Sequence, residues 1–328
     1  MSEITVVIPN YNGMKYLAEC MTSLCREQQN APGYEVLIID NASVDGSVEY
    51  LQKEWCGEGV RLISLPENTG FCHAVNLGIR EAKTPYVILL NNDTKAEAGF
   101  VRGLYDAIRE NEKIFSVSAK MLMWDRPELI DDAGDRYCVL GWAYSRGKGR
   151  PAADYDKSVP VFSACGGAAI YRRSVFEEIG YFDEEHFAYL EDIDVGWRAK
   201  LYGYDNVYCP DAAVYHVGSG TSGSRYNSFK VRLAARNCIY LNYKNMPGWQ
   251  ILLNAPFLLA GIFVKYLFFV KKGLGKDYRE GLARGFELCR KHKDRKVRFL
   301  WKNLPAYVAI QVELWKNILL FLPGRRGN

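Results

Sequence analysis

The sequence predicts an α/β fold built on a single, mostly parallel, Rossmann-like sheet with helices on both faces. Two observations in the first hundred residues support this prediction. Short, continuous apolar runs alternate with helix-length segments, and a turn signal of Asn, Asp or Gly precedes each of those segments. Continuous apolar runs are typical of parallel strands buried on both faces of a sheet, and parallel strands need crossover connections such as helices.

The expected strands and helices alternate along the chain. Four strands are expected, at Ile4–Pro9, Tyr34–Asp40, Val60–Leu65 and Tyr86–Leu90. Three helices are expected between them, at Met14–Gln28, Ser47–Trp55 and Phe71–Lys83. The strand segments are rich in β-branched residues, and Asn-Gly, Asp-Gly and Asn-Thr-Gly sequences mark where the helices begin.

Polar clusters follow all four of these strands. They are "NYNG", "DNASVDGS", "PENTG" and "NNDT". One such cluster alone indicates an ordinary turn, because Asn, Asp and Gly dominate turns. The carboxyl ends of parallel strands lie along one edge of a sheet, and α/β proteins bind ligands there. The four clusters together therefore predict a functional cleft at that edge.

The middle of the chain, residues 100–217, mixes strand and helix signals. Strands are expected within 113–121 and 160–173, a helix within 188–204, and two further short strands within 205–220. Gly166 and Gly167 interrupt the second of these strands, the helix ends before Gly203, and the last two strands join at Pro210.

The last third of the chain is much more apolar. Ile251–Val270 spans 20 residues, which is just long enough to cross a bilayer as a helix. Pro256 and Lys265 interrupt this run, so we expect a helix that lies in the membrane interface. Residues 305–323 carry polar side chains in their middle and fit a second interfacial helix. The alternative is a helical subdomain whose apolar faces pack on the catalytic domain or in a homodimer.

The charge is distributed unevenly along the chain. The net charge of +4 combines −6 in residues 1–270, +8 in residues 271–302 and +2 in residues 303–328. A basic segment beside apolar runs fits an anionic membrane surface better than a nucleic acid. We therefore expect a cytoplasmic protein that is peripheral on the inner face of the cell membrane and binds no nucleic acid.

Other patterns exclude several classes of protein. The nine cysteines contain no C-x-x-C pair, which indicates reduced thiols and neither a disulfide framework nor a zinc site. No basic n-region precedes the first strand, so no secretory signal is expected. P-loop, zinc-protease and α/β-hydrolase motifs do not occur. Residues 218–223, "GSGTSG", lack the context of a dinucleotide site and are expected to form a loop that closes over a phosphate.

Carboxylates and amides are the remaining candidates for chemistry. Asp93 is a hard oxygen donor at a strand end, and Mg²⁺ or Mn²⁺ needs only one or two protein carboxylates when a nucleotide diphosphate completes its shell. Asn91 and Asn92 could align phosphates or sugar hydroxyls beside it. His216 is either a packed, hydrogen-bonded residue or a metal ligand.

A second cluster lies in the expected helix around residues 188–204. Glu191 and Asp194 share one face of that helix, and Asp192 points elsewhere, into the expected cleft. Arg198 follows Asp194 at the spacing of a helix-surface ion pair.

Five motifs in this order resemble those of the inverting family-two glycosyltransferases of the GT-A fold. They are "VVIPNYNG", "IIDNASVDGS", "ENTGFCHAVNLGI", "LLNNDT" and "FAYLEDIDVGWRAKLYGY". The resemblance covers residues 3–245, and the subgroup it points to is the bacterial rhamnosyltransferase-like enzymes of surface-polysaccharide assembly. It implies a GT-A domain at residues 1–225 and a membrane-associating helical region at residues 226–328.

The resemblance also implies roles for individual residues. Asp40 recognises the nucleotide base, and Pro9 and Tyr11 line the base pocket. The full donor-binding set is Pro9, Tyr11, Asp40, Asn68, Gly70, Asn91 and Asn92. The predicted acceptor-binding residues are Gly166, Gly167 and Glu191. The predicted catalytic base is Asp192, and the predicted metal ligands are Asp93 and His216.

Two details qualify these roles. Asn91 replaces the first aspartate of the family's DXD motif, so we expect a weakly held Mg²⁺ or Mn²⁺ that stays mainly with the donor's diphosphate. Gly166 and Gly167 allow an acceptor to approach closely, and the alternative there is a β-bulge.

The implied function is inverting transfer of a sugar, L-rhamnose from dTDP-L-rhamnose, to a lipid-linked or polysaccharide acceptor in cell-surface glycan assembly. One alternative is a galactosyl- or glucosyltransferase that uses a UDP-sugar. The other is a non-catalytic subunit that binds a sugar nucleotide or a lipid. The presence of both Asp93 and Asp192 argues against that subunit.

Overall fold

The computed structural model describes residues 2–27, 31–57, 59–218 and 226–321. Within them, ten strands form one sheet, in which eight follow the order β10-β12-β6-β11-β4-β1-β2-β3, while β5 pairs with β12 and β7 with β6. The first four strands are parallel and lie at β1 Ile4–Asn10, β2 Tyr34–Asp40, β3 Val60–Ser64 and β4 Tyr86–Leu90. Their helices are α1 Met14–Glu27, α2 Ser47–Glu54 and α3 Phe71–Glu81. These bounds confirm the predicted strands and helices to within two residues at each end.

The remaining strands make the sheet mixed. They are β5 Thr94–Ala96, β6 Ile114–Met123, β7 Arg126–Asp132, β10 Val159–Pro160, β11 Ala168–Arg172 and β12 Asp205–His216. β11 runs antiparallel between β4 and β6, whereas β12 is parallel to β6. The prediction of two short strands joined at Pro210 is wrong, because β12 is one strand with a register shift between Tyr208 and Ala213. Pro210 lies in that irregular stretch, where its missing N–H is tolerated.

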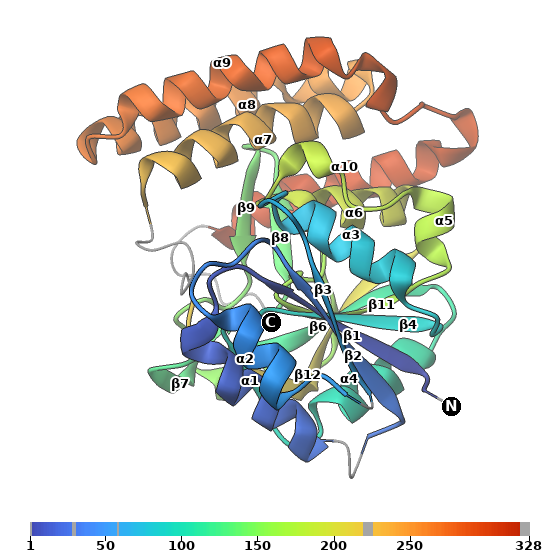
Figure 1. The fold of residues 1–328 in the computed structure, drawn as a ribbon. Helices are drawn as coiled ribbons and strands as arrows, with labels where there is room; N and C mark the ends of the chain where they lie inside the picture. Colours follow the sequence, from blue (N-terminus) through green and yellow to red (C-terminus); the bar gives the residue numbers. More distant parts are fainter. Residues whose placement is uncertain (1, 28–30, 58, 219–225, 322–328) are drawn as a thin grey trace.

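Helices cover both faces of the sheet, as predicted (Figure 1). One buried core joins the sheet to α1, α2 and α4 Phe100–Arg109. The other joins it to α3, α5 Val175–Ile179 and α6 Glu191–Leu201. Alternate β1 residues enter the two cores: Val6 and Ile8 lie in the first and Val7 in the second. This two-sided burial explains why the parallel strands are continuous apolar runs.

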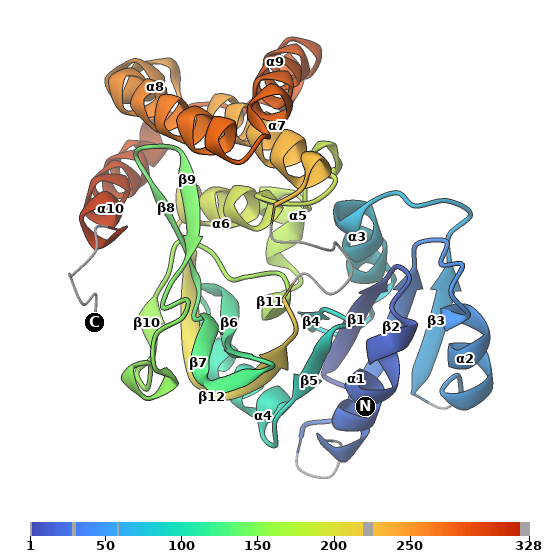
Figure 2. The ribbon, with the colours of Figure 1, turned by 90° about the vertical axis from the view of Figure 1, so that its left-hand side faces the viewer.

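A two-stranded hairpin projects from the sheet toward the C-terminal helices (Figure 2). Its strands are β8 Asp135–Cys138 and β9 Trp142–Ser145, which pair antiparallel. The sequence did not predict this hairpin. The described residues also contain short 3₁₀ helices at η1 Ala152–Asp154, η2 Glu184–His186, η3 Lys293–Arg295 and η4 Trp301–Asn303.

Four longer helices form the C-terminal part, of which α7 to α9 lie together at one end of the molecule (Figure 1). They are α7 Ser228–Asn245, α8 Gly248–Lys271, α9 Gly275–Lys291 and α10 Leu304–Phe321. α8 continues through Pro256 without a break. Among the described residues, α8 alone has the length and apolar composition needed to cross a membrane. Only 11% of its most apolar 18-residue window is buried in the protein.

The polar residues of α10 contact the rest of the chain. The Gln311 side chain accepts hydrogen bonds from Gln250 and Asn254 of α8, each at 2.9 Å. The Asn317 side chain donates to the Tyr137 carbonyl at 2.9 Å. These side chains therefore stabilise the packing of α10 on the protein. For this face of α10, the structure agrees with the alternative of a packed helical subdomain and not with an interfacial helix. The opposite face of α10 exposes Val308, Val312, Trp315 and Leu319.

Candidate active site

A cleft of about 1570 Å³ opens at the carboxyl ends of β1 and β4 and at the end of β12. The β8–β9 hairpin and helices α6, α7 and α8 form its other walls. Of the predicted site residues, those that line it are Pro9, Tyr11, Asn68, Gly70, Asn91, Asn92, Asp93, Gly166, Gly167, Glu191, Asp192 and His216. Folding thus brings together side chains that lie up to about two hundred residues apart in the sequence, and their individual roles remain predictions.

Asp40 is the one predicted site residue that does not line the cleft. Its carboxylate is fully buried and accepts hydrogen bonds from the Asn10 amide at 2.7 Å and the Ser43 hydroxyl at 2.6 Å. The side-chain oxygen Oδ1 of Asn10 in turn accepts a hydrogen bond from the Asn92 side-chain amide at 2.6 Å. A chain of hydrogen bonds therefore links Asp40 to the "NND" cluster. Asp40 is thus connected to the cleft through Asn10, and its predicted role in base recognition remains a prediction.

Gly13 makes this close approach possible. A Cβ atom at this position would lie 2.0 Å from the Asn92 amide nitrogen and 2.3 Å from the Asn10 side-chain oxygen Oδ1. Any larger residue would therefore displace the Asn10 and Asn92 side-chain amides at this edge of the cleft.

Asp93 and His216 meet at one corner of the cleft. β5 pairs with β12 in a register that places Thr94 opposite His216, so the two side chains come together. His216 Nε2 lies 3.4 Å from Asp93 Oδ1, and His216 Nδ1 lies 2.8 Å from Asp131 Oδ2. Burial opposes the charge on the imidazole, but the hydrogen bonds to Asp131 and Asp93 outweigh it and raise the pKa of His216 to about 9.

This corner fits a divalent metal ion. A carboxylate and an imidazole nitrogen are ligand types that such ions accept, although an ion bound here must displace the proton of the His216 imidazolium. Metal-bound histidines usually donate their other N–H to a carboxylate. Asp131, which would orient His216 in this way, was missed by the sequence analysis. The available signal was the segment "IDDAGD", which places three carboxylates within five residues.

Asp192 lies on a second wall of the cleft, in the first turn of α6. Its carboxylate hydrogen-bonds with that of Asp135 from the hairpin. Burial raises the pKa of both groups; the charges of Asp132 and Asp192 raise the pKa of Asp135 further, whereas the hydrogen bond from Asp135 lowers that of Asp192. The upward shift is the stronger at Asp135, so a proton shared by the pair favours Asp135, and Asp192 is the member that suits a base. Asp135 was also missed by the sequence analysis.

Gly166 and Gly167 form a turn that leads into β11, and the alternative of a β-bulge is wrong. The Gly167 carbonyl accepts a hydrogen bond from the Asn91 N–H at 2.8 Å. A Cβ atom on Gly167 would lie 3.1 Å from the Asn91 amide nitrogen. The turn is therefore packed directly against the "NND" cluster, and its role toward an acceptor remains a prediction.

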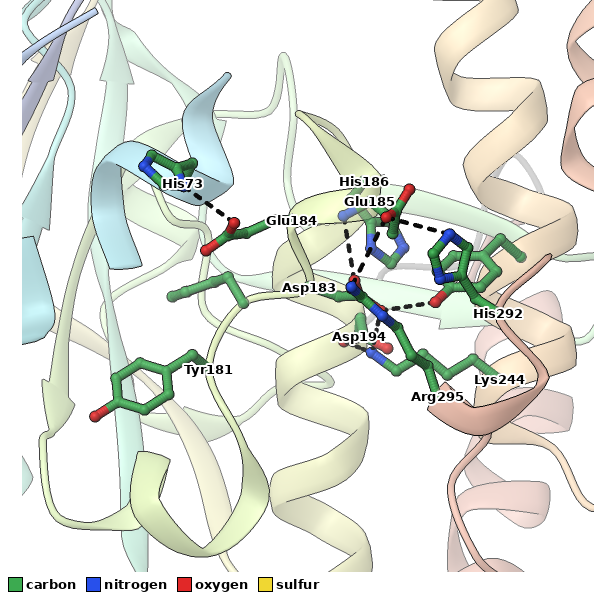
Figure 3. A network of polar contacts seen from close by, with 12 residues as sticks. His73, Tyr181, Asp183, Glu184, Glu185, His186, Asp194, Lys244, His292 and Arg295 are labelled. Atoms are coloured by element: carbon green, nitrogen blue, oxygen red, sulfur yellow. Dashed lines mark hydrogen bonds and ion pairs between the residues drawn. The ribbon is translucent and has the colours of Figure 1, made fainter. Parts of the chain in front are cut away.

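The Asp194–Arg198 ion pair is buried, so the prediction of a surface salt bridge is wrong. Arg198 Nη2 lies 2.8 Å from Asp194 Oδ2, and the two side chains are 6% and 0% exposed. α7 and α10 cover this part of α6, which no pattern within α6 itself could reveal. Lys244 Nζ of α7 lies 2.9 Å from the same Asp194 oxygen and 2.8 Å from Asp183 Oδ2 (Figure 3). These pairs connect the helix that carries Asp192 to the C-terminal helices.

The sheet, with its cleft at the carboxyl edge, defines the GT-A class of sugar-transferring enzymes, as predicted. The mannosyltransferase PcManGT of Pyrobaculum calidifontis, solved with GDP-Man and Mn²⁺, matches with a TM-score of 0.56 at 15% identity over 98% of this chain and 81% of that chain. GalNAc-T7, solved with UDP, GalNAc and Mn²⁺, matches with a TM-score of 0.58 at 16% identity over 74% of this chain and 48% of its own length.

The chain belongs to glycosyl transferase family 2, whose profile matches residues 5–180, more than half of its length. This match confirms the resemblance seen in the sequence motifs, and the chain is accordingly a glycosyltransferase. Residues 218–223, which were predicted to close over a phosphate, lie outside the described residues except for Gly218.

Two curated relatives are similar over most of the chain. N-acetylglucosaminyl-diphospho-decaprenol L-rhamnosyltransferase of Mycobacterium tuberculosis is 29% identical over 275 residues, which cover 75% of this chain and 86% of the relative. Poly-beta-1,6-N-acetyl-D-glucosamine synthase of Staphylococcus epidermidis is 22% identical over 232 residues. Those residues cover 70% of this chain but 53% of that synthase, so the chain matches only about half of it.

Proposed function

We propose that the protein transfers L-rhamnose from dTDP-L-rhamnose, with inversion, to a lipid-linked or polysaccharide acceptor in the assembly of a cell-surface glycan. The observation that carries this proposal is the presence in one cleft of the Asp93–His216 corner and the Asp192 carboxylate. The 29% identical relative is an N-acetylglucosaminyl-diphospho-decaprenol L-rhamnosyltransferase, which supports L-rhamnose as the transferred sugar and a lipid-linked acceptor.

In this proposal Asp93 and His216 hold Mg²⁺ or Mn²⁺ together with the diphosphate of the donor. A bound ion neutralises the charge that builds up on the departing diphosphate. Asn91 and Asn92 orient the diphosphate and the sugar, with Asn92 held by Asn10 at 2.6 Å. Both solved structures of similar fold contain Mn²⁺, which supports a divalent ion.

Asp192 is the proposed general base. Its carboxylate takes the proton from the acceptor hydroxyl as that oxygen attacks the anomeric carbon opposite the leaving diphosphate. In this proposal Asp135 carries the proton of the carboxyl pair, and the Ile193 N–H, which donates to Asp192 Oδ1 at 2.7 Å, helps to orient the base. Displacement in a single step inverts the anomeric centre, by analogy with the logic of glycoside hydrolysis.

A screen of donors by thermal unfolding tests the proposal. A donor that binds only the folded state stabilises it by about 2.7 kcal/mol at 100 times its dissociation constant. We expect dTDP-L-rhamnose with Mn²⁺ to raise the unfolding temperature more than UDP- or GDP-sugars do. Asp93→Ala should lose the Mn²⁺-dependent part of this increase, because it removes the only carboxylate proposed to bind the ion directly.

The matched control for this screen is Asp106→Ala. Asp106 is 60% exposed on α4, away from the cleft, and its pair with Arg102 spans 3.8 Å. The control should retain the full donor response. A response to a UDP-sugar with none to dTDP-L-rhamnose would instead establish the galactosyl- or glucosyltransferase alternative.

We also propose that the protein lies peripherally on the inner face of the cell membrane. α8 exposes Leu259, Phe263 and Leu267, and the basic segment 271–302 follows this helix. Apolar side chains beside Lys and Arg are typical of helices that lie in a membrane interface. Asn254 near the start of α8 and Gly261 in its middle are both buried against the protein. One face of α8 thus contacts the protein while the rest is exposed, and this two-sided arrangement favours an interfacial position over a span.

Sedimentation with anionic vesicles tests the membrane proposal. Phe263→Glu/Leu267→Glu removes two exposed side chains whose burial contributes about 1.5–3 kcal/mol each, so binding should weaken by roughly tenfold or more. Val44→Glu is the control, because Val44 is 90% exposed on the catalytic domain. Wild-type protein that stays in the supernatant while the vesicles pellet would contradict the proposal, and a dimer in that fraction would indicate that a second copy covers α8.

A further inference from the structure

Lys265 is a cation in the cleft that has no acidic partner among the residues that the structure describes. It lines the cleft from α8, and its ammonium lies 5.6 Å from the centre of the Trp142 ring. Among the described residues it makes no ion pair, whereas other cleft cations do: Lys148 lies 2.6 Å from Asp131 and Arg232 lies 3.3 Å from Glu280. Burial lowers the pKa of Lys265, so a bound anion would favour its charged form.

The β8–β9 hairpin connects Lys265 to the acidic wall of the cleft. Asp135 stands at its base opposite Ser145, and Cys138 pairs with Trp142 near its tip. Cys138 lies three residues after Asp135 along β8, so the base and the tip of the hairpin are about 10 Å apart. One sugar ring followed by phosphate groups covers a separation of this order.

The tip of the hairpin is fixed to α8. The Trp142 indole N–H donates to the Gly261 carbonyl at 3.2 Å. A Cβ atom on Gly261 would lie 2.1 Å from the Leu140 carbonyl oxygen, so the contact depends on glycine. Gly261 and Lys265 are one helical turn apart and share a face of α8. The position of Lys265 relative to the hairpin is therefore rigid.

An apolar surface continues from Lys265 to the outside of the protein. Phe268, Phe269 and Phe321 line the cleft beside it, and the Phe321 ring centre lies 5.3 Å from that of Trp142. Next to them, the exposed side of α8 carries Phe263 and Leu267, which are 60% and 49% exposed. The cleft thus presents carboxylates, then an unpaired cation, then aromatic rings that lead to an apolar face. This order matches an amphiphile whose sugar, phosphates and hydrocarbon chain follow one another.

We propose that Lys265 binds the phosphate groups of a lipid diphosphate, with its sugar directed toward Asp192 and its hydrocarbon chain along Phe268, Phe321 and the exposed face of α8. This inference rests on the proposed transfer to a lipid-linked acceptor and assigns that acceptor a subsite. The phosphate of an ordinary anionic lipid headgroup shares part of this chemistry, so the test separates the two sources.

Equilibrium binding of farnesyl diphosphate to the full chain tests the subsite, with saturating dTDP and Mn²⁺ present to occupy the donor side. Lys265→Met should weaken binding at least tenfold, and Lys265→Arg should restore most of it because the charge returns. Lys83→Met is the matched control, since Lys83 is exposed before β4, at the opposite edge of the sheet. The control should bind as the wild type does. Equal unfolding temperatures for wild type and Lys265→Met would show that the loss is local.

Three further ligands decide what the site recognises. Inorganic pyrophosphate and farnesol each lack one half of the amphiphile and should bind much more weakly than farnesyl diphosphate. Unchanged binding of farnesyl diphosphate by Lys265→Met would overturn the inference. Equally tight, Lys265-dependent binding of phosphatidylglycerol would also overturn it, in favour of a general headgroup site. The binding assay transfers no sugar, so its result does not depend on the proposed function. If binding depends on Lys265 but the protein transfers no sugar to a lipid acceptor in a separate assay, the subsite is supported and the proposed function is refuted.

Discussion

Asp192→Asn is expected to lower the rate of sugar transfer by about 10²–10⁴-fold, the usual contribution of a positioned general base. The asparagine amide occupies the same space at the start of α6 but cannot take the proton of the acceptor hydroxyl. Donor binding should persist, because the donor-side residues belong to other strands and loops. The measurement is single-turnover transfer at saturating donor, together with the donor-induced increase in unfolding temperature. Glu110→Gln, an exposed carboxylate at the end of α4, is the control.

The pH dependence of transfer gives this prediction a second readout. Burial raises the pKa of Asp192 above its ordinary 3.8, and only the ionised carboxylate accepts a proton. The rate should therefore fall as the pH falls through that raised pKa. Asp135→Leu removes the hydrogen bond that lowers the pKa of Asp192, so the acidic limb should move to higher pH. Asp135→Asn keeps a donor and should move the limb less.

Transfer at the wild-type rate by Asp192→Asn would show that another group is the base. A rate that is low at every pH in both Asp192→Asn and Asp135→Leu, together with lost donor binding, would instead indicate damage to the cleft. The two variants together therefore separate proton transfer from structure.

The parallel half of the sheet was predictable because its signals are local. In "YEVLIID" the apolar run is itself the strand Tyr34–Asp40, and the polar turn after it marks the cleft edge. The same is true of "YVILLNND", which supplies the strand Tyr86–Leu90 and the Asn91–Asp93 cluster. No tertiary information was needed for these elements, because a strand that is buried on both faces consists of consecutive apolar residues.

The hairpin and its carboxylate could not be predicted in this way. β8 is the four-residue strand "DRYC", which contains two charged residues and shows no apolar run. Its tip is held by α8, more than a hundred residues later in the chain. Asp135 lies 57 positions before Asp192, and Asp131 lies 85 positions before His216. Only the folded sheet brings these pairs together, so no spacing rule within one element reveals them.

Lys244→Met is expected to destabilise the protein by about 3–5 kcal/mol, the usual effect of removing one partner from a buried ion pair. Lys244 lies 2.8 Å from Asp183 and 2.9 Å from Asp194, and its side chain is 8% exposed (Figure 3). Without it, Asp194 retains Arg198, and Asp183 retains Arg295 at 2.6 Å. Two carboxylates then share less positive charge in a site that excludes water. Urea unfolding measures the loss, with Lys53→Met as the control for an exposed pair worth about 0–1 kcal/mol.

The pH dependence of unfolding distinguishes a charge effect from a packing effect at Lys244. Burial opposes ionisation of Asp183, but Lys244 outweighs it and holds the pKa at about 2, against an ordinary value of 3.8. This contribution to stability is present above pH 3.8 and is lost as the pH falls through about 2. His186 adds to the acid sensitivity, because burial lowers its pKa from 6.5 to about 4, and stability is lost as the pH falls between these values.

In Lys244→Met the pKa values of Asp183 and Asp194 should rise, so both carboxylates become protonated at a higher pH than in the wild type. Protonation removes the uncompensated buried charge and reduces the destabilisation of the variant. The difference in unfolding free energy between the two proteins should therefore be greatest at neutral pH and shrink toward pH 4. A difference that stays constant from pH 7 to 4 would mean that lost packing of the lysine stem, and not its charge, accounts for the effect. Because Asp194 lies two residues after Asp192 on α6, the same variant should also slow transfer at temperatures where it remains folded.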